Sequence, residues 1–135
     1  MSHKYLEELA LSDDARFFLD DSWEHNTERR EKWAAEREKY GFDSRETWGL
    51  REAFYLWLYE RLRMFTDCAA GIIRLDYHTF EYKGQSYKQS EIIDMMLERI
   101  RLYFSPNFSE SSEEHAGKVN EIAELWSLVL PVMWW

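Results

Sequence analysis

The sequence predicts a small, mainly α-helical domain (α+β) of four to five helices, with a short β-hairpin inserted around residues 72–88. Three observations support this fold class. Apolar residues recur at spacings of three and four, most clearly from Leu50 to Phe65, which is the period of a helix. Residues 72–88 instead alternate aromatic and polar side chains, as a hairpin does. Finally, 135 residues with only two Pro and five Gly suit one domain over residues 1–135.

The N-terminal part, residues 1–40, is expected to be helical and charged. Residues 1–24 are predicted to form one or two short helices. A second stretch, residues 26–40, has Asn26 or Thr27 as N-cap and is followed by Gly41, where a left-handed residue commonly ends a helix. Because this helix has few apolar positions, it packs by one narrow stripe, projects from the body or pairs with a second chain.

The core is expected to lie in residues 41–135 and to centre on a helix over residues 43–69. Gly49 disfavours helix, so a first turn at residues 44–48 is predicted to be separate from the main helix. The spacing of the apolar residues indicates one side facing the core. The residues expected to face inward are Leu50, Phe54, Trp57, Leu58 and Leu62.

The remaining elements follow from local signals. In residues 72–88, Lys83-Gly84 marks the hairpin turn, and Ile72, Ile73 and Leu75 could add a third strand. A helix capped by Ser90 is predicted over residues 90–104. The last helix is expected to start at a capping box of Ser111 and Glu114 and to end near Leu130, before Pro131.

Composition narrows the classes of function. Seven Trp, eight Tyr and eight Phe are more than a core of this size needs, so some should lie in a pocket or an interface. A net charge of −9 disfavours direct binding to nucleic acid or to anionic membranes. No apolar run approaches the ~20 residues of a membrane span. The single cysteine, Cys68, is consistent with a reducing cytosol.

Motifs for catalysis are sparse, and we expect no cofactor, no metal and no catalytic residue. No His follows a Glu at the Glu-x-x-His spacing of helical di-iron sites. Glu91 and Asp94 match half of the paired acidic motif of magnesium-dependent nucleotide pyrophosphatases, but an earlier Glu-x-x-Glu lies about sixty residues away. Ordinary helix-start acids explain these two residues better.

Two groups of residues are candidates for binding. The first combines aromatic and Arg side chains, which suit a flat ligand or a protein interface: Trp48, Tyr55, Tyr59 and Arg61. Tyr55 and Tyr59 are expected on the face away from Leu58 and Leu62. The second is an acidic surface, because residues 1–40 and 105–135 each carry a net charge of −4 and could share one face. Its members are Asp13, Asp14, Asp20, Asp21, Glu113 and Glu114.

The segment Phe42-Asp43-Ser44-Arg45-Glu46-Thr47-Trp48-Gly49-Leu50, followed by Trp57-Leu58-Tyr59-Glu60-Arg61-Leu62, resembles a motif of small bacteriophage and prophage accessory proteins. In these proteins a (G/F)-x-(D/S)-x-(D/E)-T-W-x-L segment precedes a helix with an aromatic residue and an Arg. The resemblance covers roughly residues 40–135 and implies a phage origin. It carries over no catalytic residue. Small acidic phage proteins often act against host machinery, including bacterial immune systems.

The expected function is therefore that of a noncatalytic phage accessory protein. It would bind and inhibit a host protein in the bacterial cytoplasm, and the expected target is a defence effector such as a CRISPR nuclease. One alternative is a small-ligand binder that sequesters a nucleotide signal in an aromatic and Arg pocket. A second alternative is a magnesium-dependent nucleotide hydrolase. A homodimer, formed through the charged helix or the Trp-rich C-terminal end, is a further expectation.

Overall fold

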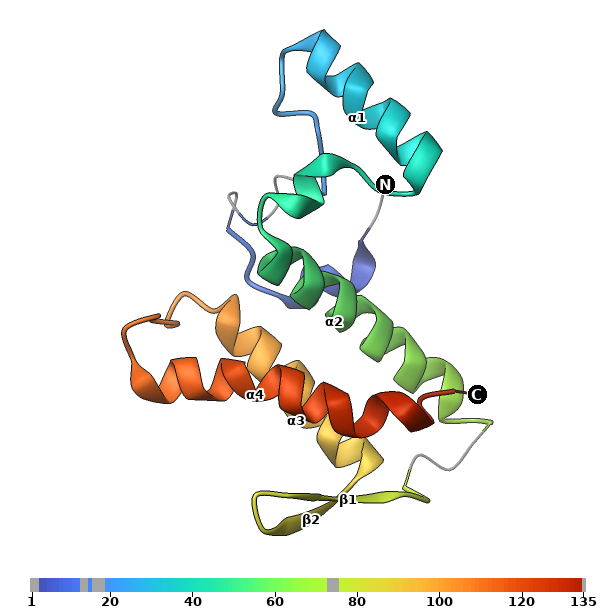
Figure 1. Cartoon of the computed structure of the whole chain (residues 1–135), viewed down its shortest axis with the longest axis vertical. Coiled ribbons are helices and arrows are strands. Elements are labelled where there is room, and N and C mark those ends of the chain that lie inside the picture. The colour runs from blue at the N-terminus through green and yellow to red at the C-terminus, as the bar shows by residue number, and fades with distance from the viewer. Residues whose placement is uncertain (1–2, 13–14, 16–18, 73–75, 135) are drawn as a thin grey trace.

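The computed structural model describes residues 3–12, 15, 19–72 and 76–134. Within these residues the chain forms four α-helices and one two-stranded hairpin, with short 3-10 helices between them (Figure 1). The mainly α-helical fold with an inserted hairpin, predicted from the sequence, is thereby confirmed. Among the described residues, no helix combines the length and the apolar composition needed to cross a membrane.

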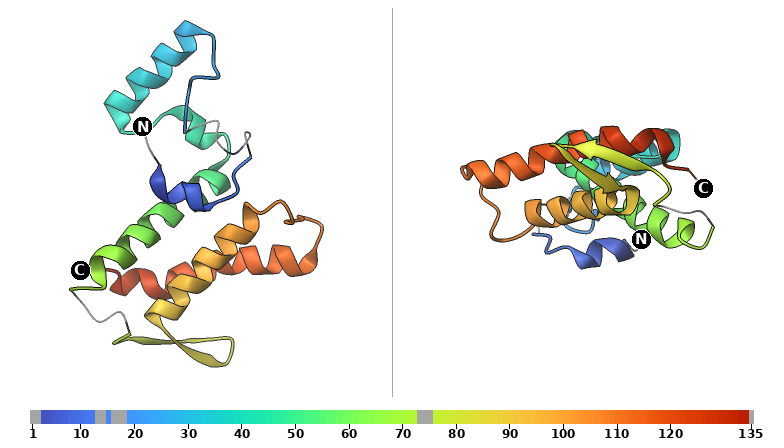
Figure 2. Two further views of the ribbon diagram at one scale, coloured as in Figure 1. Left: turned by 180° about the vertical axis from the view of Figure 1, so that it is seen from behind. Right: turned by 90° about the horizontal axis from the view of Figure 1, so that it is seen from below.

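Three helices form the body of the molecule: α2 (Leu50–Ala69), α3 (Gln89–Tyr103) and α4 (Glu113–Val129). α3 and α4 pack closely along their lengths, and α2 lies across α3 (Figures 1 and 2). Their apolar faces meet in one core, because each helix carries buried residues at spacings of three and four. The fully buried side chains include Leu56, Leu58, Leu62, Ile92, Met96, Ile100, Ile122 and Leu125.

The N-terminal segment lies on α2 before the chain leaves the body. The 3-10 helix η1 (Lys4–Glu8) packs against α2, and Leu6 within it and Leu9 just after it are buried. Helix α1 (Thr27–Tyr40) then extends beyond the N-terminal end of α2, away from α3 and α4 (Figures 1 and 2). We call residues 19–48 the arm. The charged helix is thus a projection from the body, one of the arrangements that its few apolar residues predicted.

Local signals set the ends of the arm's helices as expected. The Asn26 side chain accepts a hydrogen bond from the Arg29 amide at the start of α1. Gly41 ends this helix in the left-handed conformation, with φ of 86°, which Gly adopts without a steric penalty. A separate 3-10 turn, η3 (Ser44–Thr47), precedes Gly49, and α2 starts after it. The predicted interruption at Gly49 is confirmed.

The hairpin joins β1 (Thr79–Tyr82) to β2 (Gln85–Lys88), with Phe80 opposite Tyr87. Its two turn residues, Lys83 and Gly84, both have positive φ, as a tight hairpin turn requires. A third strand was predicted from Ile72, Ile73 and Leu75. Ile72 lies in a turn, whereas Ile73 and Leu75 fall outside the described residues.

Two predicted caps are displaced by one or two residues. α3 begins at Gln89, and the Glu91 side chain accepts a hydrogen bond from the Lys88 amide, so Ser90 is not the cap. α4 is capped by Ser112, whose hydroxyl accepts from the His115 amide, rather than by Ser111. Ser112 thus satisfies one amide of the first turn of α4, and Glu91 satisfies the amide of the residue just before α3.

Candidate interaction surface

Tyr55 and Tyr59 are buried, so the prediction that they face away from the core is wrong. Both belong to the core cluster of the helical body. The Tyr59 hydroxyl donates to Oε1 of Glu8 over 2.7 Å and accepts from Nε of Arg101 over 3.1 Å. The Tyr55 ring packs edge-on against Tyr103, with 5.1 Å between the centroids. These two residues therefore join η1, α2 and α3, and they cannot line an open pocket.

The opposite side of α2 faces solvent, although it is also apolar. Leu50 is 68% exposed and Trp57 is 43% exposed, which contradicts their predicted place in the core. Phe54 stacks on Trp57, and the Arg61 guanidinium lies 5.0 Å from the Trp57 ring centroid. We call this face the outer stripe. It consists of Leu50, Phe54, Trp57, Arg61, Met64 and Cys68.

Trp48 lies on the arm, apart from the buried tyrosines with which it was grouped. Its ring meets Trp33 edge-on at 5.9 Å between centroids, and Trp23 contacts the same Trp33 ring at 5.8 Å. Trp33 is buried between them, whereas Trp48 remains 56% exposed. We call Trp23, Trp33 and Trp48 the tryptophan cluster. Of the predicted ligand-binding set, the structure thus leaves Trp48 and Arg61 at the surface, on different elements.

A buried ion pair fixes the arm next to this cluster. Arg45 is only 2% exposed, and its guanidinium donates to both carboxylate oxygens of Asp43 at 3.0 and 2.8 Å. Arg45 donates a third hydrogen bond, of 3.1 Å, to the Asp20 carbonyl. The face of its guanidinium covers the Trp33 ring. A bidentate Arg–carboxylate pair of this kind fixes orientation as well as charge.

Further polar contacts join α1 to η3. Arg37 on α1 donates to Oδ2 of Asp43 over 2.7 Å, and the Ser44 hydroxyl donates to Glu36 over 2.9 Å. Burial alone would raise the pKa of Asp43, but bonds from Arg45 and Arg37 outweigh it and hold that pKa below its ordinary value. Asp43 is therefore ionised at neutral pH, and it holds two cations from different elements together.

The predicted acidic surface is not assembled in one place. Asp20 accepts bonds from the Ser22 amide and hydroxyl, and Asp21 lies 3.4 Å from Arg37, so both carboxylates are used within the arm. Glu113 and Glu114 are exposed in the first turn of α4, at the other end of the molecule. Because α1 and α4 do not pack together (Figure 1), the two acidic ends form no shared face. Asp13 and Asp14 lie outside the described residues.

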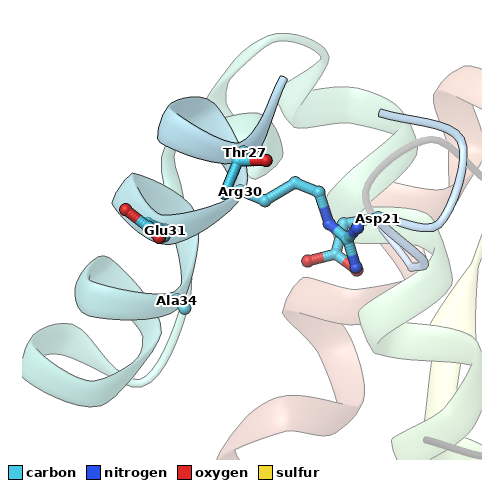
Figure 3. Close-up of a pocket in the computed structure, with 5 residues that line it drawn as sticks. All are labelled: Asp21, Thr27, Arg30, Glu31 and Ala34. Atoms are coloured by element: carbon cyan, nitrogen blue, oxygen red, sulfur yellow. The ribbon is translucent and has the colours of Figure 1, made fainter. Parts of the chain in front are cut away.

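An open hollow of about 290 Å³ lies on the arm between α1 and the preceding loop. Its lining residues are Asp21, Thr27, Arg30, Glu31 and Ala34. Figure 3 shows the Arg30 side chain reaching toward Asp21, with 3.8 Å between their charged groups. Such an open depression, lined mostly by charged residues, does not enclose a small molecule as a typical ligand pocket does. We assign it no ligand.

The residues considered for metal chemistry do not converge in the structure. Glu91 accepts the hydrogen bond that starts α3, and Asp94 is exposed one turn later. Across the described ranges, no group of three or more His, Cys, Asp or Glu side chains is arranged to hold a metal ion. The magnesium alternative thus gains no geometric support from Glu91 and Asp94.

Sequence reasoning missed the role of Arg45 and of the tryptophan cluster. Asp43 was recognised as a helix-start residue, and its side chain does accept from the Arg45 amide. A second use of the same carboxylate, as the partner of the Arg45 guanidinium, depends on burial by Trp33 from another helix. The four residues Trp23, Trp33, Asp43 and Arg45 span more than twenty positions, so no local pattern connects them.

Comparisons of the chain with protein-family models, with curated protein sequences and with solved structures each gave no match.

Proposed function

We propose that this chain is a noncatalytic binding protein that docks onto another protein through its arm. One observation carries the proposal: the buried Arg45–Asp43 pair joins the segments of the arm to one another, and the arm presents Trp48 to solvent. Only Trp33 of the fourteen residues in α1 is buried. A helix that contributes so little to the core, but is fixed in place, is more useful for contacts with a partner than for the stability of the fold.

The chemistry of the arm fits a protein partner. Three further aromatic side chains on it are exposed: Trp23, Tyr40 and Phe42. Trp and Tyr are enriched among the residues that dominate binding energy at protein interfaces. Because the buried ion pair orders the arm in advance, binding would cost less conformational entropy than ordering a loose segment. The expected partner has an apolar pocket for Trp48 and a mixed-charge rim facing α1.

The resemblance to phage accessory proteins supplies the class of partner to test first. It favours a bacterial defence effector, such as a CRISPR nuclease, met in the cytoplasm of the host cell. Asp20 and Asp21 were expected to attract a basic partner, but their carboxylates are engaged within the arm. Apolar contact at Trp48 replaces acidic attraction as the main source of affinity.

Affinity capture from a bacterial lysate, with the wild-type protein and with Trp48→Ala, tests the proposal. We expect a protein that the wild type captures and Trp48→Ala loses. Tyr77→Ala is the matched control, since Tyr77 is a large exposed aromatic residue outside the arm. Equal capture by the wild type and Trp48→Ala would contradict the arm as the docking surface. For a CRISPR nuclease, inhibition of DNA cleavage by the wild type and not by Trp48→Ala is the corresponding functional result.

A further inference from the structure

The outer stripe of α2 is a second apolar surface, separate from the arm. Its residues follow one another at intervals of four, three, four, three and four, from Leu50 to Cys68. This is the narrow seam of a two-helix coiled coil rather than the wider face that packs into a globular core. At 1.5 Å per residue the seam is about 27 Å long. Leu50, Trp57, Arg61 and Met64 of the stripe are exposed, whereas Phe54 and Cys68 are partly buried.

Within the part of the chain that the structure describes, α2 therefore has two apolar faces, and only the inner one is covered. The inner face includes Leu58 and Leu62, which are fully buried. The outer face includes Leu50 and Met64, both more than half exposed. A helix that is apolar on both sides is normally buried on both sides. The exposed side thus has the properties of an interface.

We infer that the outer stripe pairs with the same stripe of a second copy of this chain, with the two α2 helices antiparallel. The series of intervals reads the same in both directions, so an antiparallel copy brings every stripe residue opposite another stripe residue. Leu50 meets the other copy's Cys68, Phe54 meets Met64, and Trp57 meets Arg61. The contact is isologous, as in most two-fold dimers.

Charge selects this orientation. Arg61 is the one charged residue of the stripe, and antiparallel pairing places its guanidinium on Trp57 of the other copy. Within one chain the same two groups already lie 5.0 Å apart, in the geometry of a cation–π contact. Parallel pairing would instead set Arg61 against Arg61 in the seam, where like charges repel. Glu60, beside the stripe, is held by His3 over 3.0 Å and faces its own Arg61 over 3.7 Å.

Because of the net charge of each chain, the strength of self-association should depend on the salt concentration. Two chains of charge −9 repel each other at long range, and added salt screens that repulsion. Because the seam itself is apolar apart from Arg61, its own contacts are weakened little by salt. We therefore expect self-association to tighten as the sodium chloride concentration rises.

Sedimentation over a range of protein and salt concentrations provides the first test. A species of twice the chain mass of 16.5 kDa should form with rising concentration and be favoured by salt. Trp57→Ala should raise the dissociation constant of this dimer about tenfold or more, because it removes a central aromatic anchor. Leu50→Glu is the second variant and should also weaken the association, while the exposed position of residue 50 keeps the monomer folded. Tyr77→Ala should leave the association unchanged. A chain that stays monomeric at all concentrations would overturn the inference.

Disulfide trapping tests the orientation. In Leu50→Cys, residues 50 and 68 lie at opposite ends of α2 and cannot bond within one chain. Mild oxidation should give a covalent dimer whose peptide map shows the 50–68 linkage between copies. Tyr77→Cys, which leaves the stripe intact, should give no 68–77 linkage between copies. Links of 50 to 50 or 68 to 68 would instead indicate parallel pairing and overturn the inference. The result is independent of capture by Trp48, so either conclusion can fail without the other.

Discussion

The guanidinium of Arg45 lies 4.3 Å from the centroid of the Trp33 ring and connects α1 to η3, the turn that precedes α2. The same guanidinium is paired with Asp43, and each of the two side chains is only 3% exposed. A buried charge pair contributes little net stability compared with apolar residues, but removing one partner is costly because the other remains buried. The arm therefore depends on both members of the pair.

Arg45→Met should loosen the arm while the helical body stays folded. Breaking a buried pair costs about 3 kcal/mol, which corresponds to roughly a hundredfold faster exchange for amides that open locally. Hydrogen exchange followed by mass spectrometry should show this increase in α1 and not in α3. Arg29→Met is the control, because Arg29 is an exposed cation on α1 itself. Unchanged exchange in α1 would show that the ion pair does not hold the arm.

The two faces of α2 can be compared with one substitution at two leucines. Leu58 is 0% exposed, so Leu58→Ala should lower the free energy of unfolding by about 2–5 kcal/mol. Leu50→Ala should change it by less than about 0.5 kcal/mol at concentrations where the chain is monomeric. Urea unfolding followed by circular dichroism measures both. Similar losses at the two positions would mean that the outer stripe is not free within one chain.

These leucines also show where sequence reasoning failed. Leu50, Phe54, Trp57 and Arg61 follow a helical period, but so do Tyr55, Leu58, Tyr59 and Leu62 on the other side. Periodicity identifies a helix with apolar faces and cannot say which face meets α3. That choice depends on the partner helices and on Glu8, which gives the Tyr59 hydroxyl a hydrogen-bond partner inside the fold. Hence the helix was predicted correctly and its exposed side was not.

Helix ends and turns, which depend on residues close in the sequence, were predicted better than the exposed side of α2. The ends of α1 follow from Asn26 and Gly41, and the hairpin turn follows from Lys83 and Gly84, because each needs only local geometry. The arm's ion pair involves a carboxylate, a guanidinium and an aromatic ring brought together by tertiary packing. For the same reason the acidic groups near the two ends of the chain gave the wrong expectation of a shared surface.

Acid should loosen η1 from α2 through Glu8. Bonds from Arg63, and then from Tyr59, lower the pKa of Glu8 to about 2. Because the folded pKa is depressed, the stabilisation is complete above the unfolded value of about 4.3 and is lost as pH falls from there toward 2. Glu8 is partly exposed, so solvent screening limits the effect to about 1 kcal/mol.

Urea unfolding of wild type and Glu8→Gln between neutral pH and pH 3 measures this contribution. The difference in stability between the two proteins should be largest near neutral pH and should shrink below about pH 4, where the unfolded chain takes up a proton at Glu8. Glu7→Gln, at the exposed neighbouring position, is the control and should show no such convergence. A difference that stays constant with pH would contradict the assigned role of Glu8.

Tyr103 should make the fold sensitive to alkali. Burial, and then the hydrogen bond to Glu52, raise the pKa of its hydroxyl to about 12. Because the folded pKa is raised, the stabilisation is complete below the unfolded value of about 10 and is lost as pH rises from 10 toward 12. Tyr103→Phe removes the bond and should cost about 1 kcal/mol at neutral pH. Its stability should then fall less steeply than that of the wild type above pH 10, as measured by urea unfolding.

Tyr77→Phe, at an exposed position, is the matched control. Parallel alkaline losses in wild type and Tyr103→Phe would show that another group controls the transition.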